Sequence, residues 1–129
     1  MKIRTTRMDK SIPMPEYVDR AAGFDFVCRQ DEVIQAGETK LLPGNIGMDI
    51  PEGYVLLLAP RSSTHERFGL VMPHSVGIID PFSVDIVKEL NIMLKNISDQ
   101  PVTIKRGEKI AQGILIKYEK VEFEEVEHD

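Results

Sequence analysis

The sequence has few of the residues that build disulfide or metal scaffolds. Its 129 residues include one cysteine, Cys28, so no disulfide can form within the chain and a reducing compartment is expected. The three histidines are not spaced as metal ligands, and Cys28 has no nearby partner. We therefore expect neither a zinc site nor a cysteine or serine nucleophile working in a triad.

Long apolar runs and excess positive charge are also absent. The longest apolar runs fall far short of the roughly 20 residues that a membrane span needs, and residues 1–4 lead into polar residues, unlike a signal peptide. The formal net charge of −5 argues against binding nucleic acid through its phosphates. We expect a cytoplasmic protein without a membrane or nucleic-acid partner.

What the sequence does contain is a series of short apolar or alternating segments. About ten of them, including 2–5, 33–43, 54–59 and 110–118, are separated by turns at roughly 8–12-residue spacing, which predicts an all-β sandwich or barrel. A weaker strand is predicted at 121–126, inside an acidic tail of residues 119–129. We expect residues 1–129 to form one domain.

One segment, residues 62–68, has the signals of a helix. Ser62 or Ser63 can cap its N-terminus, and Glu66 lies three residues after Ser63, as a capping box requires. Gly69 follows as a typical helix end. The sequence therefore predicts one short helical turn among the strands.

The most informative stretch is residues 59–80. Arg61 can hold a phosphate with two parallel hydrogen bonds, and Ser62 and Ser63 can donate to the same anion. Asp80, after an apolar run, is a candidate general base for a water molecule. These residue types indicate hydrolysis of a phosphate ester or anhydride, and an anionic protein needs a local cationic pocket or a metal ion for such a ligand.

Each of these residues also has an ordinary structural interpretation. Arg61 can be a surface arginine before a helix cap, and Asp80, which precedes a proline, can be a turn residue. Asp25 can belong to a loop. Gln112, inside an apolar strand, can pair with backbone at a sheet edge. Taken singly, these signals are weak.

Taken together and in order, five segments resemble the trimeric dUTPase family over roughly residues 15–126. The resemblance implies a jelly-roll-like β-barrel with one short helix, assembled as a homotrimer with sites between subunits. The segments are Ala22–Phe26, Ile50–Tyr54, Ala59–Ser63, Gly77–Asp80 and Arg106–Gln112.

The resemblance also implies a reaction and roles for individual residues. The reaction is Mg²⁺-assisted hydrolysis of dUTP to dUMP and pyrophosphate, in which Asp80 orients and deprotonates the attacking water. Asp25 would position Mg²⁺ through water, and a hairpin that includes Gly77 and Ile79 would hold the uracil. The phosphate-binding residues would be Arg61, Ser62, Ser63 and Gln112.

The sequence departs from the family pattern at three places. His74 stands where the family has asparagine, and we expect it to add an altered contact to the base. The family has an aromatic residue, usually tyrosine, shortly after the aspartate, but residues 81–89 contain no tyrosine, and Phe82 is the candidate to stack on the deoxyribose in its place. The family's glycine-rich fifth motif, which closes over the triphosphate, does not appear, so we expect reduced activity and a weaker grip on the γ-phosphate.

Alternative functions are a dCTP-directed deaminase or another dNTP pyrophosphatase of the same fold, a nucleotide-binding regulatory protein with little catalysis, and a purely structural trimer. A deaminase needs a glutamate after the third segment. Glu89 lies one residue away from that position, which would turn it to the opposite face of the sheet. The joint presence of Asp25, Arg61, Asp80 and Gln112 argues against a purely regulatory or structural role.

Overall fold

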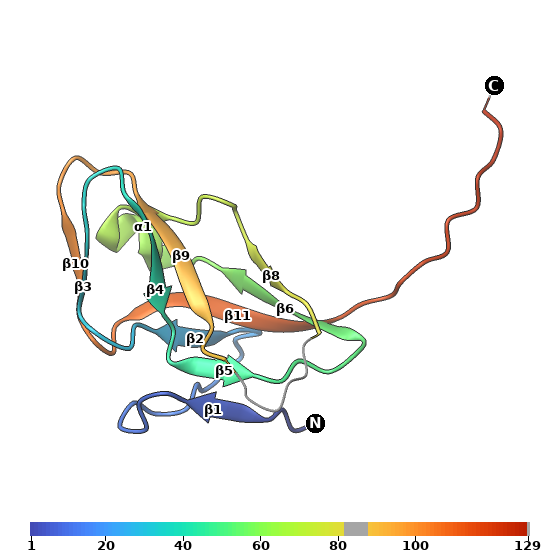
Figure 1. Cartoon of the computed structure of the whole chain (residues 1–129), viewed down its shortest axis with the longest axis horizontal. Coiled ribbons are helices and arrows are strands. Elements are labelled where there is room, and N and C mark those ends of the chain that lie inside the picture. The colour runs from blue at the N-terminus through green and yellow to red at the C-terminus, as the bar shows by residue number, and fades with distance from the viewer. Residues whose placement is uncertain (82–87, 129) are drawn as a thin grey trace.

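The computed structural model describes residues 1–81 and 88–128, and within them it contains eleven strands and one helix (Figure 1). The prediction of an all-β fold with one short helix is confirmed. The elements are β1 (Thr5–Arg7), β2 (Phe24–Val27), β3 (Glu32–Ile34), β4 (Thr39–Pro43), β5 (Ile46–Met48), β6 (Tyr54–Ala59), α1 (Ser62–Phe68), β7 (Leu70–Val71), β8 (Gly77–Ile79), β9 (Asn91–Asn96), β10 (Val102–Ile104) and β11 (Lys109–Lys117).

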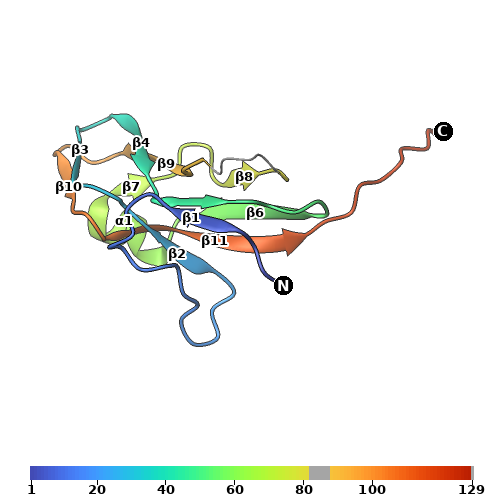
Figure 2. The same ribbon diagram turned by 60° about the horizontal axis from the view of Figure 1, so that its bottom comes forward.

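The strands pair antiparallel in four sheets that enclose one apolar core. The largest has the order β2-β11-β6-β8, and a second has the order β4-β9-β7. The pairs β1-β5 and β3-β10 complete the barrel, and Figure 2 shows β4 and β9 lying above β6 and β11. Side chains from both larger sheets fill the space between them. The fully buried ones include Phe26, Leu42, Leu56, Ile92 and Leu94. This closed arrangement is the jelly-roll-like barrel that the sequence predicted.

Two predicted strands differ from the structure in their bounds. The predicted strand 33–43 is two strands, because the chain turns at Ala36–Gly37 between β3 and β4. The two halves then join different sheets, β3 with β10 and β4 with β9. The first strand covers Thr5–Arg7, rather than 2–5, and pairs with β5.

The acidic tail forms no strand in its described residues, 119–128, so the predicted strand at 121–126 is wrong. The tail extends away from the barrel (Figures 1 and 2). Val121, Phe123 and Val126 are 67%, 91% and 76% exposed. The alternation of apolar and acidic residues is typical of a strand, but a strand also needs a neighbour to satisfy its backbone, and the tail leaves the barrel. In the described part of the chain, no helix is long and apolar enough to cross a membrane.

The loop after β1 is fastened to the turn that precedes β11. The Asp9 carboxylate accepts hydrogen bonds from the backbone and hydroxyl of Ser11 and from the Arg106 guanidinium, whose Nη2 lies 2.9 Å from Asp9 Oδ2. Arg106 also donates to the Ser11 hydroxyl. These hydrogen bonds lower the pKa of Asp9 to about 2, with the largest effect from the Ser11 hydroxyl and a smaller one from Arg106. This contact stabilises the turn that leads into the candidate site.

Candidate active site

Three segments that are distant in sequence meet at one end of the largest sheet. Gln112 on β11 lies opposite Asp25 on β2 in one register and opposite Ala59 on β6 in the other. The chain leaves β6 at Ala59 and reaches Arg61 two residues later, so the Arg61 turn begins beside Gln112. Sheet pairing therefore brings together three residues that come from separate sequence motifs, Asp25, Arg61 and Gln112.

Polar contacts link these side chains into one cluster. Arg61 Nε donates to Asp25 Oδ1 at 2.9 Å, and Arg61 Nη1 donates to the Ser63 hydroxyl at 3.0 Å. Lys109, which was not among the predicted site residues, forms an ion pair with Asp25, with 3.3 Å between Nζ and Oδ2. Gln112 Nε2 donates to the Pro60 carbonyl at 3.0 Å, so its amide makes the backbone contact that the ordinary interpretation expected.

The start of helix α1 places the Arg61 side chain in this cluster. Arg61 occupies the N-cap position in extended conformation, and its backbone N–H donates to the Thr64 hydroxyl at 2.9 Å. The predicted cap at Ser62 or Ser63, with Glu66 as partner, is wrong because the Ser63 hydroxyl accepts from Arg61 instead. The predicted end at Gly69 is confirmed, since Gly69 takes the left-handed conformation with φ 67°.

The cluster has more positive than negative charge. Arg61 and Lys109 are two cations around the single Asp25 carboxylate, and their side chains are 27%, 48% and 23% exposed. Ser62 is exposed beside them, and the Ser63 hydroxyl keeps a proton that it can donate. An anionic group that approaches this end of the sheet therefore meets a locally positive surface on a chain whose net charge is −5.

Asp80 lies apart from this cluster in a single chain. Strand β8 pairs with β6 so that Gly77 is opposite Leu58 and Ile79 is opposite Leu56, which places Asp80 level with the start of β6. Arg61 follows the other end of β6, so the two residues are separated by about 20 Å at the rise of an extended strand. Asp80 is exposed and lines a pocket of about 510 Å³ with Glu52, Val55, Pro81, Tyr118 and Lys120.

The segment before Asp80 connects the two larger sheets through a turn. His74 and Ser75 are exposed in this turn, and Gly77 is buried at its end. A Cβ on Gly77 would lie 3.1 Å from Leu58 Cβ and 3.4 Å from His74 Nε2, so His74 packs against the glycine. Ile79 is half-buried at the end of β8. Phe82, the candidate for ribose stacking, lies outside the described residues.

Glu89 holds a structural position. It pairs with Arg29, with 2.6 Å between Arg29 Nε and Glu89 Oε2, and it accepts the Asn45 backbone N–H at 2.9 Å. Its carboxylate therefore stabilises the corner between β4 and β5. The ion pair gives Glu89 a role that needs no catalysis.

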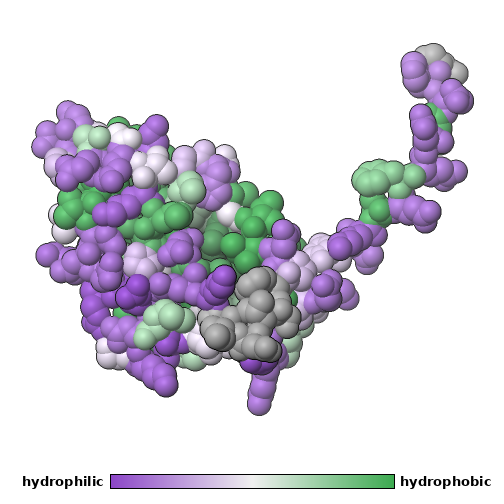
Figure 3. Space-filling model, in the orientation of Figure 1, coloured by the Kyte–Doolittle hydropathy of each residue, from purple (hydrophilic) through white to green (hydrophobic). Residues whose placement is uncertain are grey.

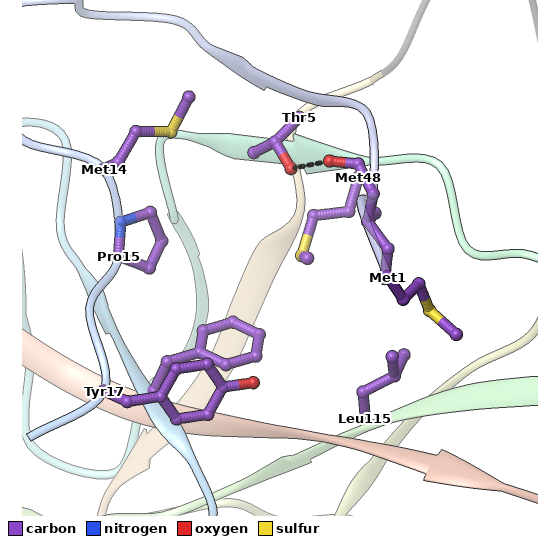
Figure 4. Close-up of a pocket in the computed structure, with 9 residues that line it drawn as sticks. Met1, Thr5, Met14, Pro15, Tyr17, Met48 and Leu115 are labelled. Carbon is purple, nitrogen blue, oxygen red and sulfur yellow. Dashed lines mark hydrogen bonds between the residues drawn. The ribbon is translucent and has the colours of Figure 1, made fainter.

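Two pockets flank this part of the barrel. Asp25 and Lys109 line one of about 390 Å³, together with Ile12 and Arg106. The other, of about 460 Å³, is mainly apolar and includes Met1, Met14, Tyr17, Met48 and Leu115 (Figure 4). Among the described residues, none of the predicted site residues lines the second pocket.

Comparisons with known proteins identify relatives along nearly the whole chain. The family model described as dUTPase matches residues 9–129. A deoxyuridine 5'-triphosphate nucleotidohydrolase of Corynebacterium glutamicum is 37% identical over 127 residues, which are 97% of this chain and 83% of the relative. One from Alcanivorax borkumensis is 34% identical, over 98% of this chain and 85% of the relative.

Solved structures have the same fold. The crystal structure of a dUTPase from Streptococcus mutans has a TM-score of 0.84 and 27% identity, and the match covers 95% of this chain and 100% of that one. The dUTPase of Staphylococcus bacteriophage 80alpha, solved with dUPNHPP, has a TM-score of 0.84 and 24% identity over 99% of this chain and 89% of that one. The likeness to the phage protein shows the fold alone.

Proposed function

This chain belongs to the dUTPase family, and on that premise we propose that it hydrolyses dUTP to dUMP and pyrophosphate as a dUTP diphosphatase. The observation that carries the proposal is the cluster of Asp25, Arg61, Ser63 and Gln112, which three separate segments build at one end of the sheet. A structural barrel needs no such cluster. The names of the curated relatives support the same reaction.

Phosphate binding is assigned to Arg61, Ser62, Ser63 and Gln112. The Arg61 guanidinium is planar, and contacts on both Nε and Nη1 fix its orientation before any ligand arrives. A preoriented arginine and two serine hydroxyls can hold the α- and β-phosphates in one geometry, and positioning contributes most to the rate of phosphoryl transfer. The Gln112 amide would exchange the Pro60 carbonyl for a phosphate oxygen, or reach that oxygen through water.

The residues present fit a magnesium ion that is held mainly by the substrate. Among the described residues there is no group of three or more carboxylate, histidine or cysteine side chains able to hold a metal ion. Mg²⁺ commonly binds through one or two carboxylates together with phosphates and retained waters, and Asp25 supplies one carboxylate beside the phosphate donors. When bound, Mg²⁺ neutralises the triphosphate and polarises it toward attack. Asp25 would accept hydrogen bonds from its water.

Asp80 is assigned as the base that orients and deprotonates the attacking water. An exposed carboxylate at the end of β8 can approach a substrate bound outside its own chain, and the turn that holds His74 and Gly77 is next to it. Backbone groups of this turn, with Ile79, would hold the uracil, and the His74 imidazole would add a contact to the base. Phe82 would stack on the deoxyribose.

The distance between Asp80 and Arg61 in one chain leads us to propose a homotrimer with sites between subunits. Exposed apolar side chains support association. Leu41, on β4, is 56% exposed, and Ile78, on β8, is 63% exposed. Figure 3 shows hydrophobic surface gathered over the sheets that contain β4, β9 and β8.

We also propose a cytoplasmic location, which the single, buried cysteine Cys28 supports.

A panel of dNTPs and NTPs with Mg²⁺, analysed for monophosphate, pyrophosphate and ammonia, tests the reaction. We expect dUMP and pyrophosphate from dUTP, whereas ammonia from dCTP would identify a deaminase. Asp80→Asn should reduce turnover by about 10²–10⁴-fold and leave nucleotide affinity nearly unchanged, because the substitution removes a base and keeps its shape. Asp99→Asn, in an exposed turn, is the matched control. Wild-type turnover in the Asp80 variant would exclude Asp80 as the base.

A further inference from the structure

Lys109 is the residue that makes the phosphate cluster positively charged. Asp25 and Arg61 form an ion pair that is neutral by itself, and Lys109 adds one positive charge at 3.3 Å from the other oxygen of the same carboxylate. Of the other cations of this turn, Lys105 is exposed, and Arg106 is bonded to Asp9 and Ser11. A site for a highly charged anion therefore depends on Lys109 for its excess charge.

A β-bulge points Lys109 to the face of the sheet that carries the cluster. Gln112 lies opposite Asp25, but Lys109 lies opposite Val27, because the register shifts by one residue between Lys109 and Ala111. In a regular strand, residues 109 and 112 face opposite sides. The extra residue of the bulge reverses this alternation, so Lys109 and Asp25 lie on the same face of the sheet. Bulges commonly redirect side chains in this way beside active sites.

Lys109 is also the more exchangeable of the two cations on Asp25. Arg61 makes contacts of 2.9 and 3.0 Å to two different side chains, whereas Lys109 makes one contact of 3.3 Å and its side chain is 48% exposed. An exposed ion pair of this kind contributes little to stability, and a lysine ammonium sits on a flexible four-carbon stem. Lys109 can therefore leave Asp25 while Arg61 stays in place.

We propose that Lys109 is a phosphate-binding residue that Asp25 holds ready in the free protein and releases to the ligand. The inference rests on the proposed function, since it gives the phosphate site a further ligand. Asp25 can exchange the Lys109 ammonium for water of a bound magnesium ion, and the freed ammonium then pairs with a phosphate oxygen. The exchange keeps every charge paired, because the carboxylate and the ammonium each gain a new partner as they separate.

Calorimetry with inorganic tripolyphosphate in metal-free buffer tests the first part. Lys109→Met should bind tripolyphosphate about tenfold or more weakly than wild type, as expected for loss of a charged hydrogen bond, and Lys109→Arg should stay within about threefold. Lys105→Met is the matched control, because Lys105 is exposed in the same turn and its loss changes the net charge equally. Lys109→Gln serves if the methionine variant does not fold. Wild-type affinity in a folded, uncharged variant would overturn the proposal.

A double-mutant cycle tests the exchange between Asp25 and the phosphate. In metal-free buffer, Asp25→Asn should tighten tripolyphosphate binding, because the carboxylate no longer competes for the ammonium. That gain in affinity should be clearly smaller in the Lys109→Met background, since only the release of Arg61 from the carboxylate can contribute there. Equal gains in both backgrounds would show that Asp25 does not hold Lys109 back from the phosphates.

A nucleotide arm separates failure of this inference from failure of the proposed function. The same proteins are titrated with the α,β-imido analogue of dUTP in the presence of Mg²⁺. If wild type binds tripolyphosphate through Lys109 but does not bind the analogue, the dUTP assignment fails and the role of Lys109 stands. If wild type binds the analogue but tripolyphosphate binding is independent of Lys109, or not observed, only the inference fails.

Discussion

Asp80 and Arg61 lie at opposite ends of strand β6. The register of β8 against β6 sets this relationship, with Ile79 opposite Leu56, near the start of β6, and Arg61 just beyond its last residue, Ala59. A water held by Asp80 cannot reach a phosphate held by Arg61 of the same chain across about 20 Å of extended strand. If both residues serve one reaction, a second copy of the chain must supply one of them.

Mixing two inactive variants tests this arrangement. We expect Asp80→Asn and Arg61→Ala each to be inactive alone, and we expect activity to return when the two are unfolded together and refolded as mixed oligomers. With random mixing at equal amounts, about one site in four combines an intact Arg61 with an intact Asp80 from the neighbour, so about a quarter of wild-type activity should appear. Steady-state assays of pyrophosphate release measure it.

The control for mixing is the same two proteins combined without unfolding, under conditions in which subunits do not exchange. Sedimentation at the assay concentration reports the oligomeric state. No recovered activity in verified mixed oligomers, or full wild-type activity in a monomer, would contradict sites between subunits.

The geometry around Arg61 predicts that lysine cannot replace it. Arg61→Lys keeps the charge but cannot contact both Asp25 and Ser63 as the planar guanidinium does. We expect the dUTP analogue to bind about tenfold or more weakly, with the barrel intact by circular dichroism. Arg67→Lys is the matched control on the same helix, since Arg67 makes a single ion pair at 3.3 Å to Glu108. Unchanged affinity in the Arg61 variant would argue that its second contact does not matter.

The contact between Asp9 and Ser11 predicts that the free energy of unfolding falls at acidic pH. Hydrogen bonds from Ser11 and Arg106 lower the pKa of Asp9 from 3.8 to about 2. The folded state therefore holds the Asp9 proton more weakly than the unfolded chain, so this stabilisation is complete above about pH 5 and is lost as the pH falls toward 2. Asp9→Asn should lower the free energy of unfolding at pH 7, and the difference from wild type should shrink steadily as the pH falls from about 5 through 2.

Urea unfolding of both proteins across this pH range measures the difference. Asp99→Asn, an exposed aspartate in a turn, should match wild type throughout. A difference for Asp9→Asn that stays constant down to pH 2 would mean that lost packing, rather than lost charge, causes the destabilisation.

Cys28 should be inert in the folded protein. The side chain is fully buried, and burial raises the pKa of the thiol to about 11. Because only the thiolate reacts, a disulfide reagent such as DTNB at pH 8 should modify the native protein at least about 10²-fold more slowly than the guanidine-unfolded protein. Absorbance at the wavelength of the released thiolate gives both rates. Rapid modification of the native state would show that the core opens near Cys28.

Local sequence signals were sufficient for several elements. The strand 54–59 and the helix 62–68 have the boundaries that were predicted, because a continuous apolar run and a terminal glycine are local features. The short motifs that contain Asp25, Arg61 and Gln112 also indicated phosphate chemistry, and the role of each residue stays a prediction. Local strand propensity does not predict the turn at Gly37 or the absence of a strand in the tail, because both depend on which distant strands are available as partners.

The sequence by itself determined the all-β fold and the residues of the candidate site, because apolar spacing and side-chain chemistry are written along the chain. Only the tertiary structure decided which of those residues meet. Antiparallel pairing brings Asp25, Gln112 and the Arg61 turn together and sends Asp80 to the far end of β6. Strand pairing also places Lys109 beside Asp25. Simple alternation of side chains along β11, counted from Gln112, would place Lys109 on the opposite face. One extra residue in β11 reverses that parity, and a bulge exists only where two strands are paired.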